Sequence, residues 1–75
     1  MASIRLNAKK LELKRKELGW TKGKLAKRIG VTQTTLHRAS LNPNNSNYDG
    51  PGEKLISGIL NLFPGSVFEE YFFLD

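Results

Sequence analysis

The residues with the clearest chemical potential in this sequence are its lysines and arginines, and most of them lie in the first half. Residues 1–38 contain eleven of the twelve Lys and Arg residues against two acidic residues, a net formal charge of +9. Residues 39–75 contain one Lys against five acidic residues, a net formal charge of −4. Such an asymmetry favours contact between a basic face and a polyanion. A solvated, lysine-rich surface is the alternative that charge alone leaves open.

A catalytic or metal site has little support in the sequence. Thr35, His37 and Glu17 are residue types that serve in catalysis, but no nucleophile motif and no pair of buried carboxylates accompanies them. The glycines within residues 19–30 are too dispersed to form a phosphate-cradling loop. With no Cys and one His, the chain has neither a disulfide framework nor a cluster of soft metal ligands. We therefore predict no enzymatic activity, no metal site and no cofactor.

The length of 75 residues has room for one compact domain, so residues 1–75 are predicted to form a single domain. No apolar run is long enough to span a bilayer. The first residues lack the apolar centre of a signal peptide, which favours a cytoplasmic location.

Apolar spacing and capping residues predict five helices. The first covers residues 6–18 and ends at Gly19, and the second and third cover residues 22–29 and 33–40. Thr21 and Thr32 are predicted to cap the second and third helices at their amino ends. An irregular connection over residues 41–52 follows.

The remaining two helices lie in the second half. A fourth helix is predicted to begin near Pro51 and to stop before Pro64, because proline restricts the residue that precedes it. A final turn or two is predicted after Ser66. The aromatic and aliphatic side chains of residues 67–74 need an apolar partner surface. They could close the core over the first and fourth helices, form a dimer interface, or do both.

The most informative segment is residues 21–40, which reads as two short helices joined by a tight turn. Leu25 and Ile29 are predicted to pack inward, and Ala26 is small enough to allow a close helix crossing. Gly30 permits the left-handed backbone that such a turn needs. Leu36 is predicted to fill the angle between the helices. This pattern predicts a helix-turn-helix, whose second helix enters the major groove of DNA in many proteins.

The sequence resembles the Cro/repressor-type (lambda-repressor-like) helix-turn-helix family of phages and bacterial mobile elements. The resemblance is carried by Leu18-Gly19-Trp20-Thr21-Lys22, Leu25-Ala26, Ile29-Gly30-Val31-Thr32-Gln33, Leu36 and Arg38. It implies an all-α fold, a compact five-helix DNA-binding domain with the helix-turn-helix at helices two and three. If a phage encodes the chain, the expected location is the cytoplasm of the host cell.

The resemblance also implies which side chains contact DNA. It places Thr32, Gln33, Thr34 and Arg38 on the groove-facing side of the third helix. Their chemistry agrees, since Gln pairs with adenine, Arg pairs with guanine, and Thr can donate, accept or touch a thymine methyl group. The expected phosphate contacts are more numerous and come from several parts of the chain: Arg15, Thr21, Lys22, Lys24, Thr35, His37 and Asn42.

Three positions depart from the family pattern. Family members often pair an Arg of helix one with an acid at the end of helix three, but Ser40 occupies that position here. We therefore expect Arg15 to be unpaired and available to a phosphate. The loop over residues 41–52 lacks basic residues, so it can offer phosphates only neutral donors such as asparagine side chains. Trp20 is larger than the usual family residue and is expected to pack in the core.

Two functions from different classes follow. The first is a sequence-specific regulator that binds a double-stranded operator, as a homodimer on two half-sites. The second is an antirepressor that binds the DNA-binding domain of a partner phage repressor and keeps it off its operator. An antitoxin would be a variant of the second class. The operator sequence and the sign of regulation are left open.

Overall fold

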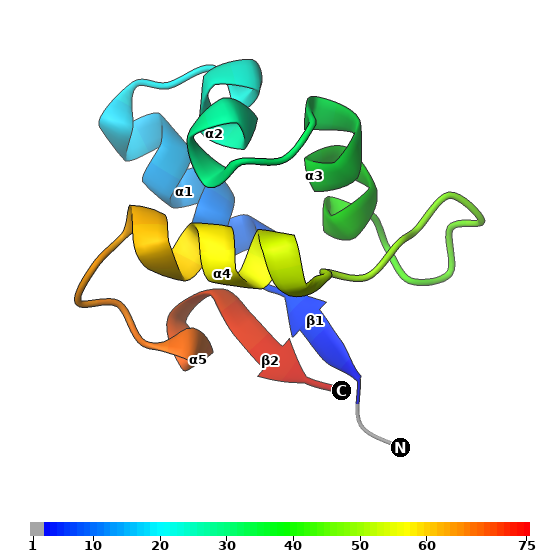
Figure 1. The fold of residues 1–75 in the computed structure, drawn as a ribbon. Coiled ribbons are helices and arrows are strands. Elements are labelled where there is room, and N and C mark those ends of the chain that lie inside the picture. Colours follow the sequence, from blue (N-terminus) through cyan, green and yellow to red (C-terminus); the bar gives the residue numbers. More distant parts are fainter. Residues whose placement is uncertain (1–2) are drawn as a thin grey trace.

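The computed structural model describes residues 3–75, which form five helices and a two-stranded sheet (Figure 1). The elements in chain order are β1 (Ile4–Leu6), α1 (Ala8–Leu18), α2 (Lys22–Ile29), α3 (Gln33–Ser40), α4 (Glu53–Leu62), α5 (Phe68–Tyr71) and β2 (Phe72–Leu74). The prediction of a small all-α fold with five helices is confirmed. The sheet is an addition that the sequence pattern did not indicate.

The ends of the first three helices follow the predicted capping chemistry. The Thr21 hydroxyl accepts a hydrogen bond from the backbone N–H of Lys24, and the Thr32 hydroxyl accepts one from Thr35, both at 3.1 Å. Gly19 and Gly30 end α1 and α2 with φ of 72° and 98°, in the left-handed region that glycine adopts without a steric cost. These local contacts set the length of each helix.

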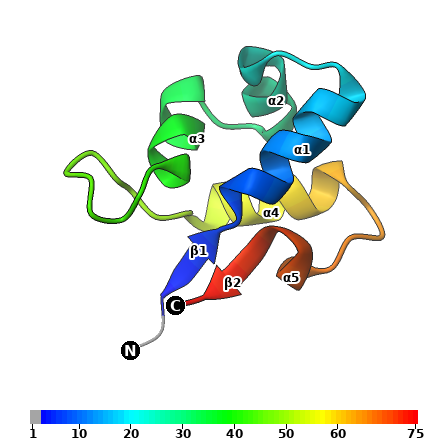
Figure 2. The same cartoon turned by 180° about the vertical axis from the view of Figure 1, so that it is seen from behind.

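The amino end of α1 differs from the prediction, because the helix begins two residues later than expected. Asn7 caps α1, and its side-chain oxygen accepts from the backbone N–H of Lys10 at 3.2 Å. The backbone N–H of Asn7 donates to the carbonyl of Tyr71 at 2.7 Å. Leu6 therefore leaves the helix and lies in β1, where it pairs with Phe72 in an antiparallel register. Figure 2 shows β1 and β2 side by side at the end of the molecule remote from α2.

The carboxyl-terminal segment closes the core, as expected, but not as a continuous helix. α5 has one turn, its N-cap is Val67 and not the predicted Ser66, and the chain then extends into β2. Tyr71 and Phe72 are among the most buried side chains, and Tyr71 stacks on Phe63 with ring centroids 5.5 Å apart. Burial raises the pKa of the Tyr71 hydroxyl. Phe73, by contrast, is 45% exposed.

The core is a single cluster to which every helix contributes. α4 crosses the centre of the molecule, with α2 on one side and α5 with β2 on the other (Figure 1). The fully packed positions come from both halves of the chain: Leu6, Leu11, Leu25, Ala26, Ile29, Leu36, Ala39, Leu55, Ile59, Phe63, Tyr71 and Phe72. The predicted inward positions of the second and third helices are thereby confirmed.

α2 and α4 approach each other closely at Gly58. A Cβ atom at this position would lie 2.2 Å from the carbonyl oxygen of Ile29 and 2.7 Å from its side-chain Cγ2. Backbone atoms cannot move aside as a flexible side chain would. The absence of a side chain at Gly58 is therefore what lets α4 lie against the end of α2.

We predict that Gly58→Ala destabilises the domain. Helix propensity alone would make the exchange favourable by about 1 kcal/mol, whereas overpacking typically costs about 1 to 3 kcal/mol and the contact here is with backbone. Urea unfolding followed by circular dichroism should show a lower midpoint. Ser57→Ala, at the exposed neighbouring position of α4, is the matched control and should leave the midpoint nearly unchanged. A midpoint for Gly58→Ala at or above that of the parent chain would contradict the packing.

Candidate nucleic-acid interface

Residues 21–40 form two helices joined by a tight turn whose backbone hydrogen bonds are satisfied locally. The N–H groups of Gly30 and Val31 both donate to the carbonyl of Ala26, at 2.9 and 3.0 Å. Thr32 then adopts an extended backbone and caps α3. The angle between α2 and α3 is consequently set by this turn and by the side chains packed beneath it.

One face of the motif is buried and the other is exposed. Leu25, Ala26, Ile29, Leu36 and Ala39 are at most 6% exposed and pack into the core. The predicted base-reading residues all lie on the solvent side of the motif, where the structure leaves them exposed: Thr32, Gln33, Thr34 and Arg38. They are accessible to a ligand as large as a duplex.

Gln33 lies across the first turn of α2. Its side-chain Oε1 is 3.3 Å from the place that a Cβ at Gly23 would occupy. Gly23 therefore makes room for the Gln33 side chain, a role that the sequence pattern did not indicate. The feature that could have suggested it is a glycine inside the first turn of a short helix, where glycine is otherwise unfavourable. The amino ends of α2 and α3 consequently present adjacent polar groups.

Six of the seven predicted phosphate contacts are exposed to solvent: Thr21, Lys22, Lys24, Thr35, His37 and Asn42. Two of these hydroxyls have a structural role as well. Thr21 caps α2, and the Thr32 hydroxyl donates to the Thr35 hydroxyl at 2.9 Å. The Oδ1 of Asn42 accepts from the backbone N–H of Asn44, which leaves its amide N–H groups as donors.

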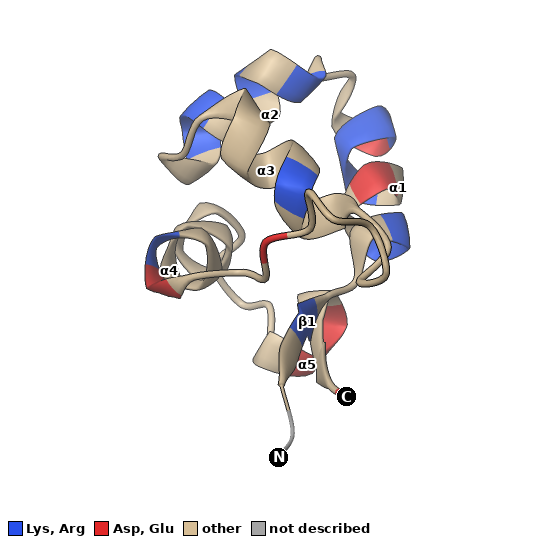
Figure 3. Cartoon of the chain, turned by 90° about the vertical axis from the view of Figure 1, so that its right-hand side faces the viewer, with Lys and Arg blue, Asp and Glu red and all other residues tan. Residues whose placement is uncertain are grey.

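Positive charge is concentrated on the helices that form and support the motif. Figure 3 shows most of the Lys and Arg residues on α1, α2 and α3, with others on β1 and α4, whereas the acidic residues lie on α1, in the loop before α4, at the start of α4 and on α5. The charge asymmetry of the sequence thus becomes an asymmetry in space. A field of this shape attracts a polyanion toward the helix-turn-helix side of the molecule.

The comparison with known protein families agrees with this geometry. Residues 11–39 match the family model described as Helix-turn-helix. Over these residues the chain is similar to the helix-turn-helix family. The resemblance to Cro/repressor-type proteins is confirmed for these residues, and the match supports a DNA-binding transcription regulator as the broad function. No curated protein and no solved structure gives a significant match to the chain.

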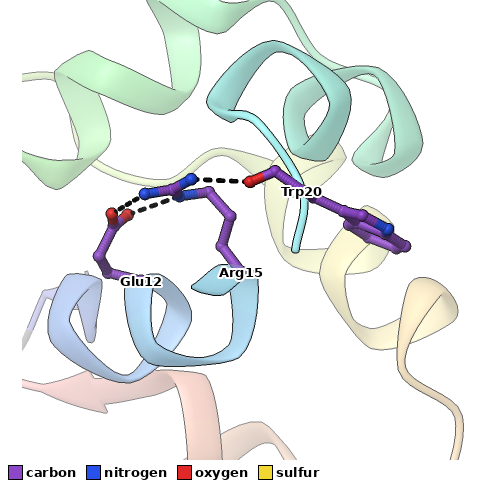
Figure 4. A network of polar contacts seen from close by, with 3 residues as sticks. All are labelled: Glu12, Arg15 and Trp20. Atoms are coloured by element: carbon purple, nitrogen blue, oxygen red, sulfur yellow. Dashed lines mark hydrogen bonds and ion pairs between the residues drawn. The ribbon is translucent and has the colours of Figure 1, made fainter. Parts of the chain in front are cut away.

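Arg15 is the seventh predicted phosphate contact, and the expectation that it is unpaired is wrong. Its guanidinium forms an ion pair with Glu12, one turn earlier on α1, and donates to the backbone carbonyl of Trp20 at 2.7 Å (Figure 4). The side chain of Arg15 is only 16% exposed. The hydrogen bond to Arg15 lowers the pKa of Glu12, and the same bond raises the pKa of Arg15.

This contact fixes the entry into the helix-turn-helix. The backbone N–H of Trp20 donates to the Arg15 carbonyl at 3.1 Å, so both backbone polar groups of Trp20 are held by one residue of α1. The acid that pairs with this arginine is Glu12 of α1 itself, and not a residue at the end of α3, where Ser40 lies.

The Trp20 side chain packs against the core and is half-buried, as predicted. Its ring also lies beneath two cations of α2, Lys24 and Arg28, each 5.6 Å from the ring centroid. A ring at this distance attracts cations through its quadrupole. Trp20 therefore holds part of the basic surface of α2 in place.

Other kinds of site find no support within residues 3–75. No three His, Cys, Asp or Glu side chains in this range lie close enough to hold a metal ion. Among the same residues, no helix has the length and apolar character needed to cross a bilayer.

We predict that Glu12→Gln lowers stability at neutral pH by a modest amount, because it removes the charge that Arg15 pairs with at a partly exposed site. The folded-state pKa of Glu12 lies below its ordinary value of 4.5, so the ionised carboxylate stabilises the folded state above that pH. Protonation removes this contribution as the pH falls through the lowered pKa. The stability difference between Glu12→Gln and the parent chain should accordingly disappear in acid.

Urea unfolding at pH 7 and at about pH 3 measures this difference. Glu17→Gln is the matched control, since Glu17 lies on the same helix and forms no ion pair within residues 3–75. A difference between Glu12→Gln and the parent that persists unchanged in acid would show that the ion pair is not its source.

Proposed function

We propose that this chain is a sequence-specific regulator that inserts α3 into the major groove of an operator and controls transcription by occupying it. The observation that carries this proposal is the row of exposed polar side chains at the start of α3, next to the amino end of α2 and within a basic surface. An α-helix fits the major groove, and base edges there present distinct patterns of donors and acceptors.

The proposed base readout rests on Gln33, Arg38, Thr32 and Thr34. Gln33 can form a bidentate pair with adenine and Arg38 one with guanine, while the threonines can contact base edges or a thymine methyl group. Thr32 offers less freedom than the others, because its hydroxyl is already bonded to residue 35. We therefore assign the larger share of discrimination to Gln33 and Arg38.

The proposed phosphate contacts surround this helix. Lys22 is the first residue of α2, where the helix dipole and free backbone N–H groups favour an anion. Thr21, Lys24, Thr35, His37 and Asn42 complete the set. Arg15 is left out, since its guanidinium is occupied by Glu12 and the Trp20 carbonyl. Its contribution is to hold α2 in place for the others.

A homodimer through the carboxyl-terminal aromatic segment fits operator binding. The support is the exposure of Ile4, Phe73 and Leu74, at 39, 45 and 66%, on a sheet of only two strands. A two-fold dimer would place two α3 helices on half-sites about one turn of DNA apart. Such a regulator acts where the DNA is, which in a bacterial cell or a phage-infected host is the cytoplasm.

We predict that Gln33→Ala and Lys22→Ala weaken DNA binding in different ways. Duplexes enriched from a randomised pool supply a specific site, and fluorescence anisotropy measures affinity for that site and for random duplex at several salt concentrations. Gln33→Ala should lose about 1 to 3 kcal/mol of discrimination at one base pair. Lys22→Ala should weaken all duplexes alike and reduce the salt slope by about 1.

Lys54→Ala is the control, since Lys54 is an exposed cation on α4, outside the helix-turn-helix segment. It should leave the salt slope and the base preference close to those of the parent chain. If no sequence is enriched, or if Gln33→Ala keeps the full preference, the operator assignment is wrong. Tight binding to a partner phage repressor in place of DNA would then favour the antirepressor function.

A further inference from the structure

A groove of about 410 Å³ lies between α1, α2 and α3, on the side of the helix-turn-helix that faces α1. Its floor is formed by three core leucines, Leu11, Leu25 and Leu36, one from each helix, and each is at most 6% exposed. Its size is within the range of cavities that hold small organic ligands. The groove is open to solvent, and no segment of residues 3–75 fills it.

Small side chains keep the groove open. Ala8 on α1 and Ser40 on α3 both line it. The Ser40 hydroxyl donates back to the Leu36 carbonyl of its own helix at 2.9 Å, so it does not bridge to α1. A longer side chain at the position of Ser40 would extend into the groove, which Arg15 also lines.

The polar rim of the groove is positively charged. Lys9, Arg15 and Lys22 line it together with one acid, Glu12. Glu12 is neutralised by Arg15, whereas Lys9 and Lys22 form no ion pair within residues 3–75. The Arg15 guanidinium is held by Glu12 and by the Trp20 carbonyl. Lys9 and Lys22 are therefore the cations of the rim that a ligand can pair with.

We propose that this groove binds a small amphipathic organic anion, with an aromatic or branched aliphatic body on the leucine floor and a carboxylate or sulfonate toward Lys9 and Lys22. An inorganic phosphate or a sugar would bring no apolar body to the groove, and a neutral apolar molecule would leave the lysines unmatched. The combination of an apolar floor with unpaired cations at the rim fits a ligand that has both features.

The ligand would also oppose DNA binding. Lys22, Gln33 and His37 line the groove and belong to the proposed DNA-contacting surface as well. A molecule held by these side chains and a duplex docked on them would compete. The groove would then make DNA occupancy respond to the concentration of a metabolite. This coupling rests on the proposed function, whereas the binding site itself does not.

The first experiment uses the free protein and anilinonaphthalene sulfonate, an aromatic anion whose fluorescence rises in an apolar site. One molecule should bind per chain. Ala8→Phe, which fills the groove from α1, should raise the Kd about tenfold or more. Lys9→Ala should raise it about threefold, as expected for loss of one partly screened charge. Lys10→Ala removes the same charge from the adjacent residue, which does not line this groove, and should leave the Kd unchanged.

Two further measurements keep this test decisive. Ser40→Phe fills the groove from α3 and replaces Ala8→Phe if the latter lowers the unfolding midpoint. Amide chemical shifts in nuclear magnetic resonance spectra should change on residues 8–15, 22–25 and 33–40 when the probe is added. Unaltered binding to both filled variants, or shifts centred on Ile4, Phe73 and Leu74, would overturn the site, because the probe would then be on the exposed sheet.

The second experiment measures duplex affinity at increasing probe concentration. The apparent Kd for DNA should rise for the parent chain and for Lys10→Ala, but much less for Ala8→Phe. If the probe binds in the groove and the duplex affinity does not change, the coupling is overturned and the site remains. If no duplex binds under any condition, the proposed function fails while the first experiment still decides the site.

Discussion

α2 packs against α3 on one side and against α4 on the other, and this double contact determines where the DNA-facing helix lies. On the side of α3, the contact involves the small residue Ala26, whose carbonyl also accepts hydrogen bonds from the two N–H groups of the turn. On the side of α4, the contact is at Gly58, where the absence of a side chain lets the backbone of Ile29 come close. Both contacts involve backbone atoms, so neither can be adjusted by a change of rotamer. The orientation of α3 is therefore a property of the backbone packing.

Arg15 connects this packing to the electrostatics of the surface. The chain has a strong excess of cations on its first three helices, and such an excess destabilises the compact state by self-repulsion. Pairing Arg15 with Glu12 removes one cation from that excess and satisfies the carbonyl of Trp20 at the same time. Trp20 in turn lies beneath Lys24 and Arg28. The like charges of this surface are thus stabilised by one ion pair and by the face of one aromatic ring.

The ion pair of Arg15 lies within α1 and has a structural consequence. A pair between α1 and α3 would join the two helices across the groove, whereas the pair with Glu12 leaves the groove open between them. Binding energy from a ligand could supply the missing connection between the helices. The groove and the proposed DNA surface share residues, because both include side chains from the amino ends of α2 and α3.

The sequence by itself determined the helix-turn-helix, its caps and its exposed polar row, because these depend on contacts within three or four residues of one another. Thr21, Gly30 and Thr32 act as predicted for that reason. Only the tertiary structure decided that Leu6 pairs with Phe72, that Gly58 meets Ile29, and that α1 and α3 leave a groove between them. Such contacts join residues far apart in the chain, where local propensity and apolar periodicity carry no information about the partner. Arg15 combines both situations. Its partner Glu12 is close in sequence, but only the tertiary structure showed that the guanidinium pairs with Glu12 and does not reach toward α3.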